Sequence, residues 1–296
     1  MKIYHSDLTT EVVLKYKQLQ PDRPLRALIS YGRCDRHHRD LMLKYRGQLD
    51  GLIMDSGTFT LNQNPKKFQK FITIGGYKSY LGQFAGMVDF YFNFDEDFSN
   101  SGFTINFGHQ LDLEHAGLDP VPVVHDCYGP EIQTYINRGH KLIAIGSGEL
   151  KYAGKDELYR IVDGIYQKGI KVHFLGCTQF EKLAYIPVFS ADSTTWNRTG
   201  GAGRIFYWNP NRIGYKKLDK IALDDSTPKR LTKYHIQNYP FSDQLEDFLY
   251  QDLVLSISDL TGENALFNRA LVNIHYFVLF EEWVNRKHKE QGFSFD

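Results

Sequence analysis

Cysteine is scarce in this sequence, and its three copies form no recognisable pair. Cys34, Cys127 and Cys177 are far apart in the 296-residue chain, and no CxxC motif occurs. An odd number of distant cysteines excludes the disulfide framework that holds small secreted domains together. It also excludes a zinc site built from neighbouring cysteines. The composition therefore indicates a protein of the reducing cytoplasm.

Long apolar runs and an excess of charge of one sign are absent as well. No stretch approaches the roughly 18 apolar residues that span a bilayer, and the first ten residues, MKIYHSDLTT, lack the basic start and apolar run of a secretion signal. Lysine plus arginine and aspartate plus glutamate each number 35, so the formal net charge is zero. We expect no membrane association, and any nucleic-acid surface would have to be a local patch.

The glycine motifs of common nucleotide-binding sheets, GxGxxG and GxxxxGK[ST], do not occur. The chain has instead a regular alternation of short apolar runs with amphipathic segments of helical length, which is typical of parallel sheets wrapped by helices. We predict an α/β fold of the (β/α)8 TIM-barrel type, and an open doubly wound sheet is the alternative. The predicted strands are 25–31, 51–55, 88–94, 121–125, 141–145, 172–175 and 188–191, with 204–208 or a segment near Ile221 as the eighth.

The whole chain, 1–296, is predicted to form a single domain. The segment 200–240 is rich in Gly, Asn, Lys and Arg without periodicity, so we interpret it as a basic insertion near the last strand. Apolar residues at helical spacing predict a long C-terminal helix over 263–289. The same spacing predicts an outer ring of helices that includes 66–84, 131–138, 156–168 and 179–185.

Three predicted strands end in an aspartate, and barrel enzymes build their sites at that end of the strands. Asp55 follows GLIM, Asp95 follows FYFNF, and Asp192 follows PVFSA. Each of them alone also fits an ordinary turn or a helix N-cap. Glycosyl transfer needs two carboxylates, one as a nucleophile and one to move protons. Asp192 and Asp55 are our candidates for these two catalytic roles.

Other residues near the same strand ends are candidates for ligand binding. Phe59 would stand four residues beyond Asp55, where its ring could stack on a planar group, although a core phenylalanine looks the same. The run GSG at Gly146 and Ser147 allows a ligand to approach the backbone, although tight turns share this pattern. His125 follows an apolar strand and fits an acid–base group or a structural histidine.

Basic residues gather in the segment 198–233, where nine of them outnumber three acidic ones and leave a local charge of plus six. Four aromatic residues interleave with them. Such a segment could bind a phosphate backbone, and a solvated loop is the alternative. The basic residues are Arg198, Arg204, Arg212, Lys216, Lys217, Lys220, Lys229, Arg230 and Lys233.

The order and spacing of these motifs resemble the tRNA-guanine transglycosylase family and its shorter relatives in phages and DNA-modification systems. The resemblance covers nearly the whole chain, through DSGTF, FNFDED, LIAIGSGEL, VHFLGC, SADSTTWNR and a terminal helix around His275. It implies Asp192 as the nucleophile and Asp55 as the general acid/base. It also implies a base-binding pocket, and phosphate contacts at Arg198 and in the basic segment at Arg204. The implied base-binding residues are Phe59, Asp95, His125, Gly146, Ser147 and Gly176.

The resemblance implies exchange of guanine for a 7-deazaguanine base in DNA or tRNA, by double displacement through a covalent intermediate on Asp192. The partners would be the nucleic acid and the free 7-deazaguanine base, and no cofactor would be needed. The family's structural zinc is not expected, because no cysteine lies between 200 and 262. A homodimer is possible, and a phage-encoded protein would work in the host cytoplasm. The alternatives are a base-releasing N-glycosidase and a non-catalytic nucleic-acid-binding barrel.

Overall fold

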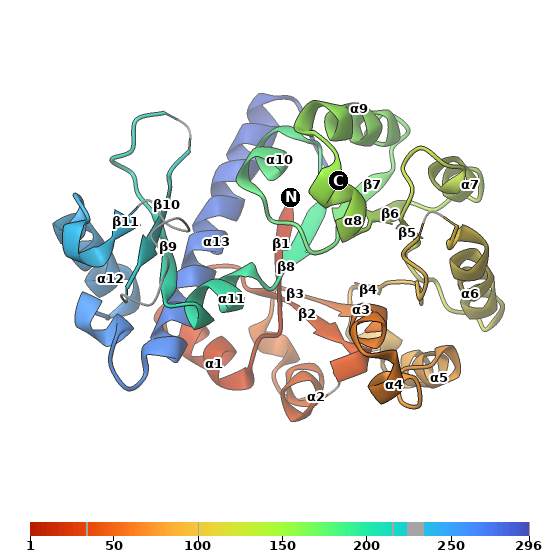
Figure 1. Ribbon diagram of the computed structural model, residues 1–296, viewed down its shortest axis with the longest axis horizontal. Helices are drawn as coiled ribbons and strands as arrows, with labels where there is room; N and C mark the ends of the chain where they lie inside the picture. The colour runs from red at the N-terminus through yellow and green to blue at the C-terminus, as the bar shows by residue number, and fades with distance from the viewer. Residues whose placement is uncertain (34, 100, 215, 224–233, 296) are drawn as a thin grey trace.

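An eight-stranded parallel sheet forms the centre of the molecule (Figure 1). The computed structural model describes residues 1–296 except 34, 100, 215, 224–233 and 296. The strand order is β4-β3-β2-β1-β8-β7-β6-β5, and all neighbouring strands of this sheet run parallel. The strands are β1 (Lys2–Ser6), β2 (Arg26–Ser30), β3 (Gly51–Asp55), β4 (Phe90–Tyr91), β5 (Val123–Val124), β6 (Leu142–Ile145), β7 (Lys171–Phe174) and β8 (Ser190–Ser193).

The two outer strands of this order, β4 and β5, also meet. A parallel bridge pairs Phe92 with Val121. The amide of Val121 donates to the carbonyl oxygen of Tyr91 at 2.8 Å, and the amide of Asn93 donates to the carbonyl oxygen of Val121 at 2.9 Å. The sheet therefore curls back on itself, and the predicted (β/α)8 barrel is confirmed.

The eighth strand of the barrel is not the one that we predicted. It is β1, whose sequence KIYHS is half polar and therefore contains no long apolar run. The segments that we considered, 204–208 and the region of Ile221, form β9 (Arg204–Trp208) and β10 (Leu218–Ala222) of a separate three-stranded sheet, which β11 (Tyr234–His235) completes. The apolar residues of β9 are buried against α13 instead of a barrel strand.

Helices surround the barrel, as the ribbon in Figure 1 shows. The predicted helix over 66–84 is divided in two, because Thr73 is an N-cap whose side chain accepts from the amide of Gly76 and starts a new helix there. The helices are α1 (Thr10–Leu19), α2 (Arg36–Leu43), α3 (Thr58–Gln63), α4 (Pro65–Phe68), α5 (Ile74–Phe84), α6 (Phe103–His115), α7 (Glu131–Asn137), α8 (Ser147–Tyr152), α9 (Lys155–Tyr166), α10 (Phe180–Tyr185), α11 (Thr195–Gly201), α12 (Ser242–Leu253) and α13 (Ala265–Glu290).

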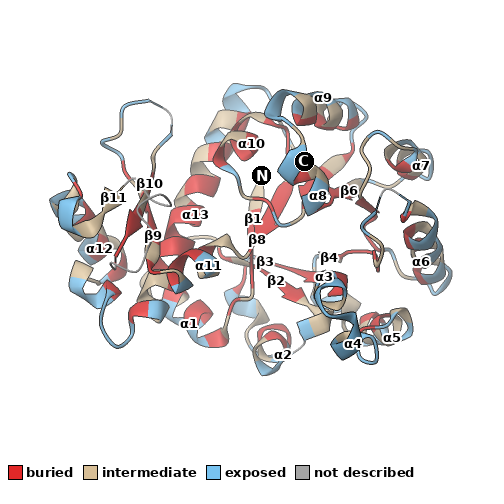
Figure 2. Cartoon of the chain, viewed as in Figure 1, coloured by how far each residue is buried: buried red, intermediate tan, exposed pale blue. Residues whose placement is uncertain are grey.

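Two apolar layers hold the barrel together. Figure 2 shows that buried residues concentrate in the barrel strands and that exposed ones lie mainly on the helices and loops around them. Alternate strand residues point inward, and among them Tyr4, Ile53, Phe92 and Val123 fill the barrel interior. The opposite faces of the strands pack against the surrounding helices. The interior is a packed core, so a ligand has access to the barrel only at its ends.

The long helix α13 lies between the barrel and the second sheet and packs on both (Figure 1). Its Glu281 accepts a hydrogen bond from the amide of Ile3 at 2.6 Å and forms an ion pair with Arg26. Whether 200–240 is an insertion in a single domain stays a prediction. Within the part of the chain that the structure describes, no helix is both long enough and apolar enough to cross a membrane.

Candidate active site

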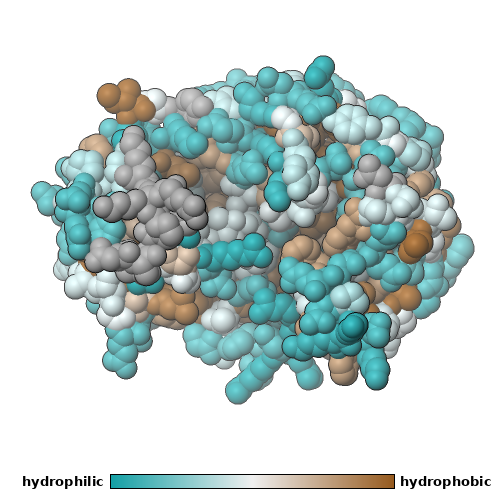
Figure 3. All heavy atoms as spheres, in the orientation of Figure 1, coloured by the Kyte–Doolittle hydropathy of each residue, from teal (hydrophilic) through white to brown (hydrophobic). Residues whose placement is uncertain are grey.

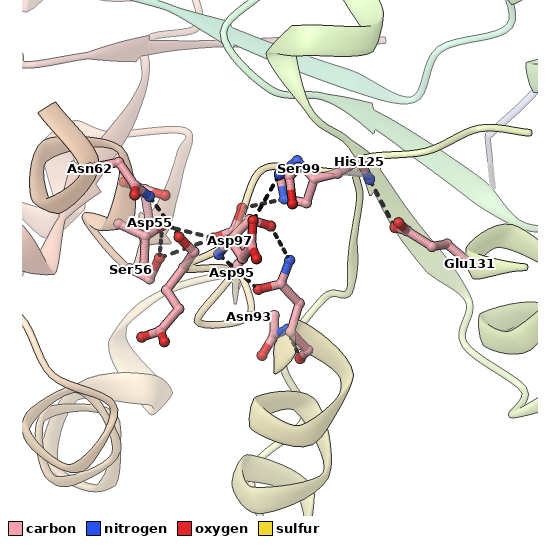
Figure 4. Close-up of polar contacts among 12 residues, drawn as sticks. Asp55, Ser56, Asn62, Asn93, Asp95, Asp97, Ser99, His125 and Glu131 are labelled. Atoms are coloured by element: carbon pink, nitrogen blue, oxygen red, sulfur yellow. Dashed lines mark hydrogen bonds and ion pairs between the residues drawn. The ribbon is translucent and has the colours of Figure 1, made fainter. Parts of the chain in front are cut away.

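Four of the predicted site residues converge at the carboxyl ends of the barrel strands. Asp55 ends β3, Asp95 and His125 follow β4 and β5, and Asp192 lies in β8. The charges of Asp95 and Asp192 both act on the carboxyl group of Asp55, so the three carboxyl groups share one cluster. Figure 4 shows Asp55, Asp95 and His125 side by side at this end of the barrel.

Asp55 is held in place by the turn that follows its strand. Its Oδ2 accepts hydrogen bonds from the amide of Gly57 at 3.0 Å and from Ser30 Oγ at 3.2 Å. Gly57 has a φ of +84°, and a Cβ at this position would lie 2.4 Å from backbone atoms of Gly32. Only glycine fits this close approach with a left-handed backbone, which explains why Gly57 follows Asp55 and Ser56 in DSGTF.

The surroundings of Asp55 favour its protonated form. Burial and the negative charges of Asp95 and Asp192 raise the pKa of Asp55 from its ordinary value of 3.8 to about 7, although the hydrogen bonds from Gly57 and Ser30 oppose the change. A carboxyl group in this range can donate and accept a proton at neutral pH.

Asp95 and His125 form a second acid–base pair. Asp95 Oδ2 lies 3.0 Å from His125 Nε2, and the other carboxylate oxygen accepts a hydrogen bond from Thr58 Oγ1 at 2.9 Å. Burial lowers the pKa of His125, but the hydrogen bond and the charge of Asp95 outweigh it, so the pKa is raised above its ordinary value of 6.5. A carboxylate that orients an imidazole is the arrangement found in many acid–base catalysts.

Three neighbours fix the His125 ring and its backbone. The ring stacks on Phe98 at 5.1 Å between centroids. The backbone amide of His125 donates to Glu131 Oε2 at 2.8 Å (Figure 4). A Cβ at Gly146 would lie 2.8 Å from His125 Nδ1, so the glycine leaves the space that the ring occupies. Gly146, the first glycine of the GSG run, thus has a structural reason, which is to admit His125.

Asp192 is held by three hydrogen-bond donors on the other side of the cluster. Its Oδ2 accepts from Ser6 Oγ at 2.8 Å. Its Oδ1 accepts from the amide of Gly176 at 2.9 Å and lies 3.2 Å from His173 Nε2. These donors come from β1, from β7 and from the turn after β7. Asp192 therefore has a fixed orientation, with its carboxylate next to the mouth of the barrel.

Phe59, Ser147 and Gly176 are the remaining predicted base-binding residues. The Gly176 amide bonds to Asp192, as described above, whereas Phe59 and Ser147 make no hydrogen bond to the three aspartates in the described part of the chain. Phe59, on α3, is half exposed, with 50% of its surface accessible. Ser147 is exposed at the first position of α8. Gly176 has a φ of +66°, and a Cβ there would meet the Cβ of Ser147 at 3.5 Å. Ser147 and Gly176 are thus neighbours, and their ligand contacts stay a prediction.

The basic segment is less available for phosphate than its composition suggests. Arg212 forms an ion pair with Asp219 at 2.7 Å, and Lys216 forms one with Glu181 at 3.3 Å. Arg198 is exposed on α11, and Arg204 donates to the carbonyl oxygen of Ala202. Lys229, Arg230 and Lys233 lie outside the described residues. Figure 3 shows mostly hydrophilic residues on the face that it displays, with the hydrophobic ones dispersed. Phosphate binding stays a prediction.

Sequence reasoning missed several residues of the site. Ser6, Ser30, Thr58 and His173 all bond to one of the three aspartates. Thr58 and His173 lie in motifs that we had singled out, DSGTF and VHFLGC, but neither residue was named as a candidate. Within the described ranges, no three His, Cys, Asp or Glu side chains are grouped in a way that could hold a metal ion.

Comparisons with known proteins give no family for this chain. No family model matches it, and a search of curated proteins finds no match. A solved structure described as "Native KDPGal structure" aligns with a TM-score of 0.40 and 10% sequence identity, covering 65% of this chain and 82% of the other. A likeness of this strength transfers no activity, and the barrel assignment rests on the strand order.

The predicted membership of the tRNA-guanine transglycosylase family is therefore wrong, and so is the function taken from it. The aligned structure is not described as a transglycosylase, and neither the family models nor the curated proteins supply one. The motifs have local structural causes instead, since DSGTF contains the left-handed turn at Gly57 and Gly146 makes room for His125. Exchange of guanine for 7-deazaguanine is not retained, and neither are its two alternatives. The partner predictions remain untested.

Proposed function

We propose that the protein is an enzyme of the general acid–base type, which moves protons on a small polar substrate held at the carboxyl ends of the barrel strands. Asp55 is the first proton-transfer group. His125, oriented by Asp95, is the second. Asp192 supplies a fixed negative charge opposite them. All proton transfers in this proposal are made by side chains of the chain itself.

The observation that carries the proposal is the cluster of three aspartates with His125 at the carboxyl ends of the strands, where burial and the neighbouring charges raise the pKa of Asp55 to about 7. An acid–base catalyst works best when its pKa lies near the working pH, because both protonation states are then populated. Clustered groups with shifted pKa values occur preferentially at functional sites. Structural ion pairs shift pKa values too, but an ion pair with a cation would lower the pKa of Asp55, and here it is raised.

His125 complements Asp55 in this proposal. Its raised pKa increases its protonated fraction at neutral pH over that of an ordinary histidine, so it can donate a proton while the carboxylate form of Asp55 accepts one. A substrate between the two would lose a proton to Asp55 and gain one from His125. After the product leaves, Asp55 gives its proton to solvent and His125 takes one from solvent, so both side chains are restored and no net proton is consumed.

Proton exchange with solvent tests the proposal. The protein is incubated in D2O with a mixture of hydroxy acids, keto acids, sugars and sugar phosphates, and mass spectrometry detects deuterium uptake or conversion. We expect at least one compound to react, and Asp55→Asn and His125→Gln to slow the reaction by about 100-fold or more. Asp22→Asn and His115→Gln are matched controls, because both residues are exposed. A reaction that proceeds equally fast in both site variants contradicts the proposal.

A further inference from the structure

His173 lies directly inside the barrel below Asp192, and the proposed proton transfers do not use it. The residue is in β7 and completely buried. Three aromatic rings surround it, with centroids at 4.8 Å for Phe92, 6.0 Å for Phe90 and 6.4 Å for Tyr4. These rings line the apolar interior of the barrel.

The two ring nitrogens of His173 have different partners. Nδ1 lies 2.8 Å from Ser190 Oγ, and Nε2 lies 3.2 Å from Asp192 Oδ1. Ser190 is completely buried, and His173 is the partner to which its hydroxyl can donate among the bonds of the described residues. Nδ1 is then the acceptor, so the ring proton is on Nε2 and points at the carboxylate.

A polar ring at this position is costly unless its bonds are made. An apolar side chain of similar size would pack against the three aromatic rings without any need for partners. The hydrogen bonds of the histidine lead in one direction, from the buried serine through the ring to the carboxylate of Asp192. The two bonds of the ring therefore restrict the orientation of the Asp192 carboxylate.

We propose that His173 is a positioning residue that fixes the Asp192 carboxylate from inside the barrel, through the hydrogen bond from its Nε2. The Ser6 hydroxyl and the Gly176 amide hold the same carboxylate from the sides. With the bond from His173 removed, Oδ1 keeps the Gly176 amide and Oδ2 keeps the Ser6 hydroxyl, so the carboxylate is held by two donors instead of three and its orientation is less restricted. The consequence for turnover rests on the function proposed above, whereas the consequence for Asp192 itself does not.

Two substitutions of His173 with different hydrogen-bonding capacity test the proposal. His173→Phe fills the apolar space and removes the donor, and His173→Gln retains an N–H donor. The first readout is the 13C NMR signal of the Asp192 carboxyl group in protein with labelled aspartate, assigned by its loss in Asp192→Asn. We expect this signal to move or broaden in His173→Phe and to stay near its wild-type position in His173→Gln. Thermal unfolding confirms that both variants are folded.

The second readout is turnover of a compound found in the D2O experiment. We expect kcat to fall by about 100-fold in His173→Phe, with KM nearly unchanged, and to recover largely in His173→Gln. An Asp192 signal that is unchanged in His173→Phe overturns the proposal, and so does equal impairment of both variants. If His173→Phe does not fold, Ser190→Ala replaces it, because it leaves the ring in place but unanchored. If the wild-type protein turns over none of the compounds, the result counts against the acid–base function but not against the positioning role of His173. The 13C NMR signal of Asp192 still tests that role.

Discussion

Substituting Asp55 by asparagine should stabilise the protein, and the gain should grow with pH. In the native state, burial and the charges of Asp95 and Asp192 raise the pKa of Asp55 from 3.8 to about 7. The native protein therefore holds a proton that the unfolded chain releases in this range. The contribution of Asp55 to the free energy of unfolding is therefore fully present below about pH 4, and it is lost as the pH rises through about 7.

The size of the effect follows from the two pKa values of Asp55. The interval from 3.8 to about 7 means that ionisation of Asp55 lowers the free energy of unfolding by about 4 kcal/mol above pH 7, compared with its value below pH 4. Asparagine carries no charge at any of these pH values, and its Oδ1 can still accept from the Gly57 amide. Between pH 5 and pH 8, we expect the stability advantage of Asp55→Asn over the wild type to increase by about 2 to 3 kcal/mol.

Urea unfolding at a series of pH values measures this difference. Other groups also titrate in this range, but those distant from Asp55 are common to both proteins and cancel in the comparison. Asp22→Asn is the control, because Asp22 is exposed, and it should show no such trend. A stability difference between Asp55→Asn and the wild type that is the same at pH 5 and pH 8 would refute the reasoning.

Three further predictions concern the neighbours of Asp55. Asp95→Asn should lower the pKa of His125, because burial is then unopposed by the charge of Asp95, and NMR titration of the ring would show it. Gly146→Ala should displace the His125 ring, since its Cβ would lie 2.8 Å from Nδ1, whereas Gly148→Ala, with open space at its Cβ, should leave the titration of the ring unchanged. Gly57→Ala should cost about 2 kcal/mol or more in urea unfolding, because of its φ of +84° and the backbone 2.4 Å away; an unchanged midpoint would contradict this.

The sequence predicted best those elements that a single clear sequence pattern marks, such as an unbroken apolar run. In β3 the unbroken apolar run GLIM ends in a charged residue, and the predicted range 51–55 coincides with the observed strand. Because parallel strands end at the same rim, Asp55, Asp95, His125 and Asp192 could be placed together from their positions after strands alone. The structure brings all four to that rim.

The elements that the sequence did not reveal depend on long-range packing. β1 pairs with β2 and β8, which are far apart in the chain, and this pairing stabilises a strand, KIYHS, that is half polar and has no regular alternation. β9 has a stronger strand pattern, RIFYW, but the long helix α13 covers it and draws it into the second sheet. The strand pattern alone does not say which sheet a strand joins.

The supporting residues of the site were hidden for the same reason. Ser6 bonds to Asp192 across 186 positions of the chain, and His173 reaches it from a neighbouring strand. A serine or a histidine within a short strand gives no local signal of such a partner. The family resemblance was wrong because short Asp and Gly motifs after strands also arise in barrels from turn geometry, as at Gly57, and from close packing, as at Gly146.

The titration of Asp55 itself tests the central claim most directly. Protein labelled with 13C at the aspartate carboxyl groups is titrated by NMR between pH 3 and pH 9, and the Asp55 signal is assigned by its absence in Asp55→Asn. The account predicts a midpoint near pH 7, which moves to lower pH when Asp95 is replaced by asparagine. A midpoint near the ordinary value of 3.8 would show that Asp55 is fully ionised at neutral pH, and it would contradict the acid–base function.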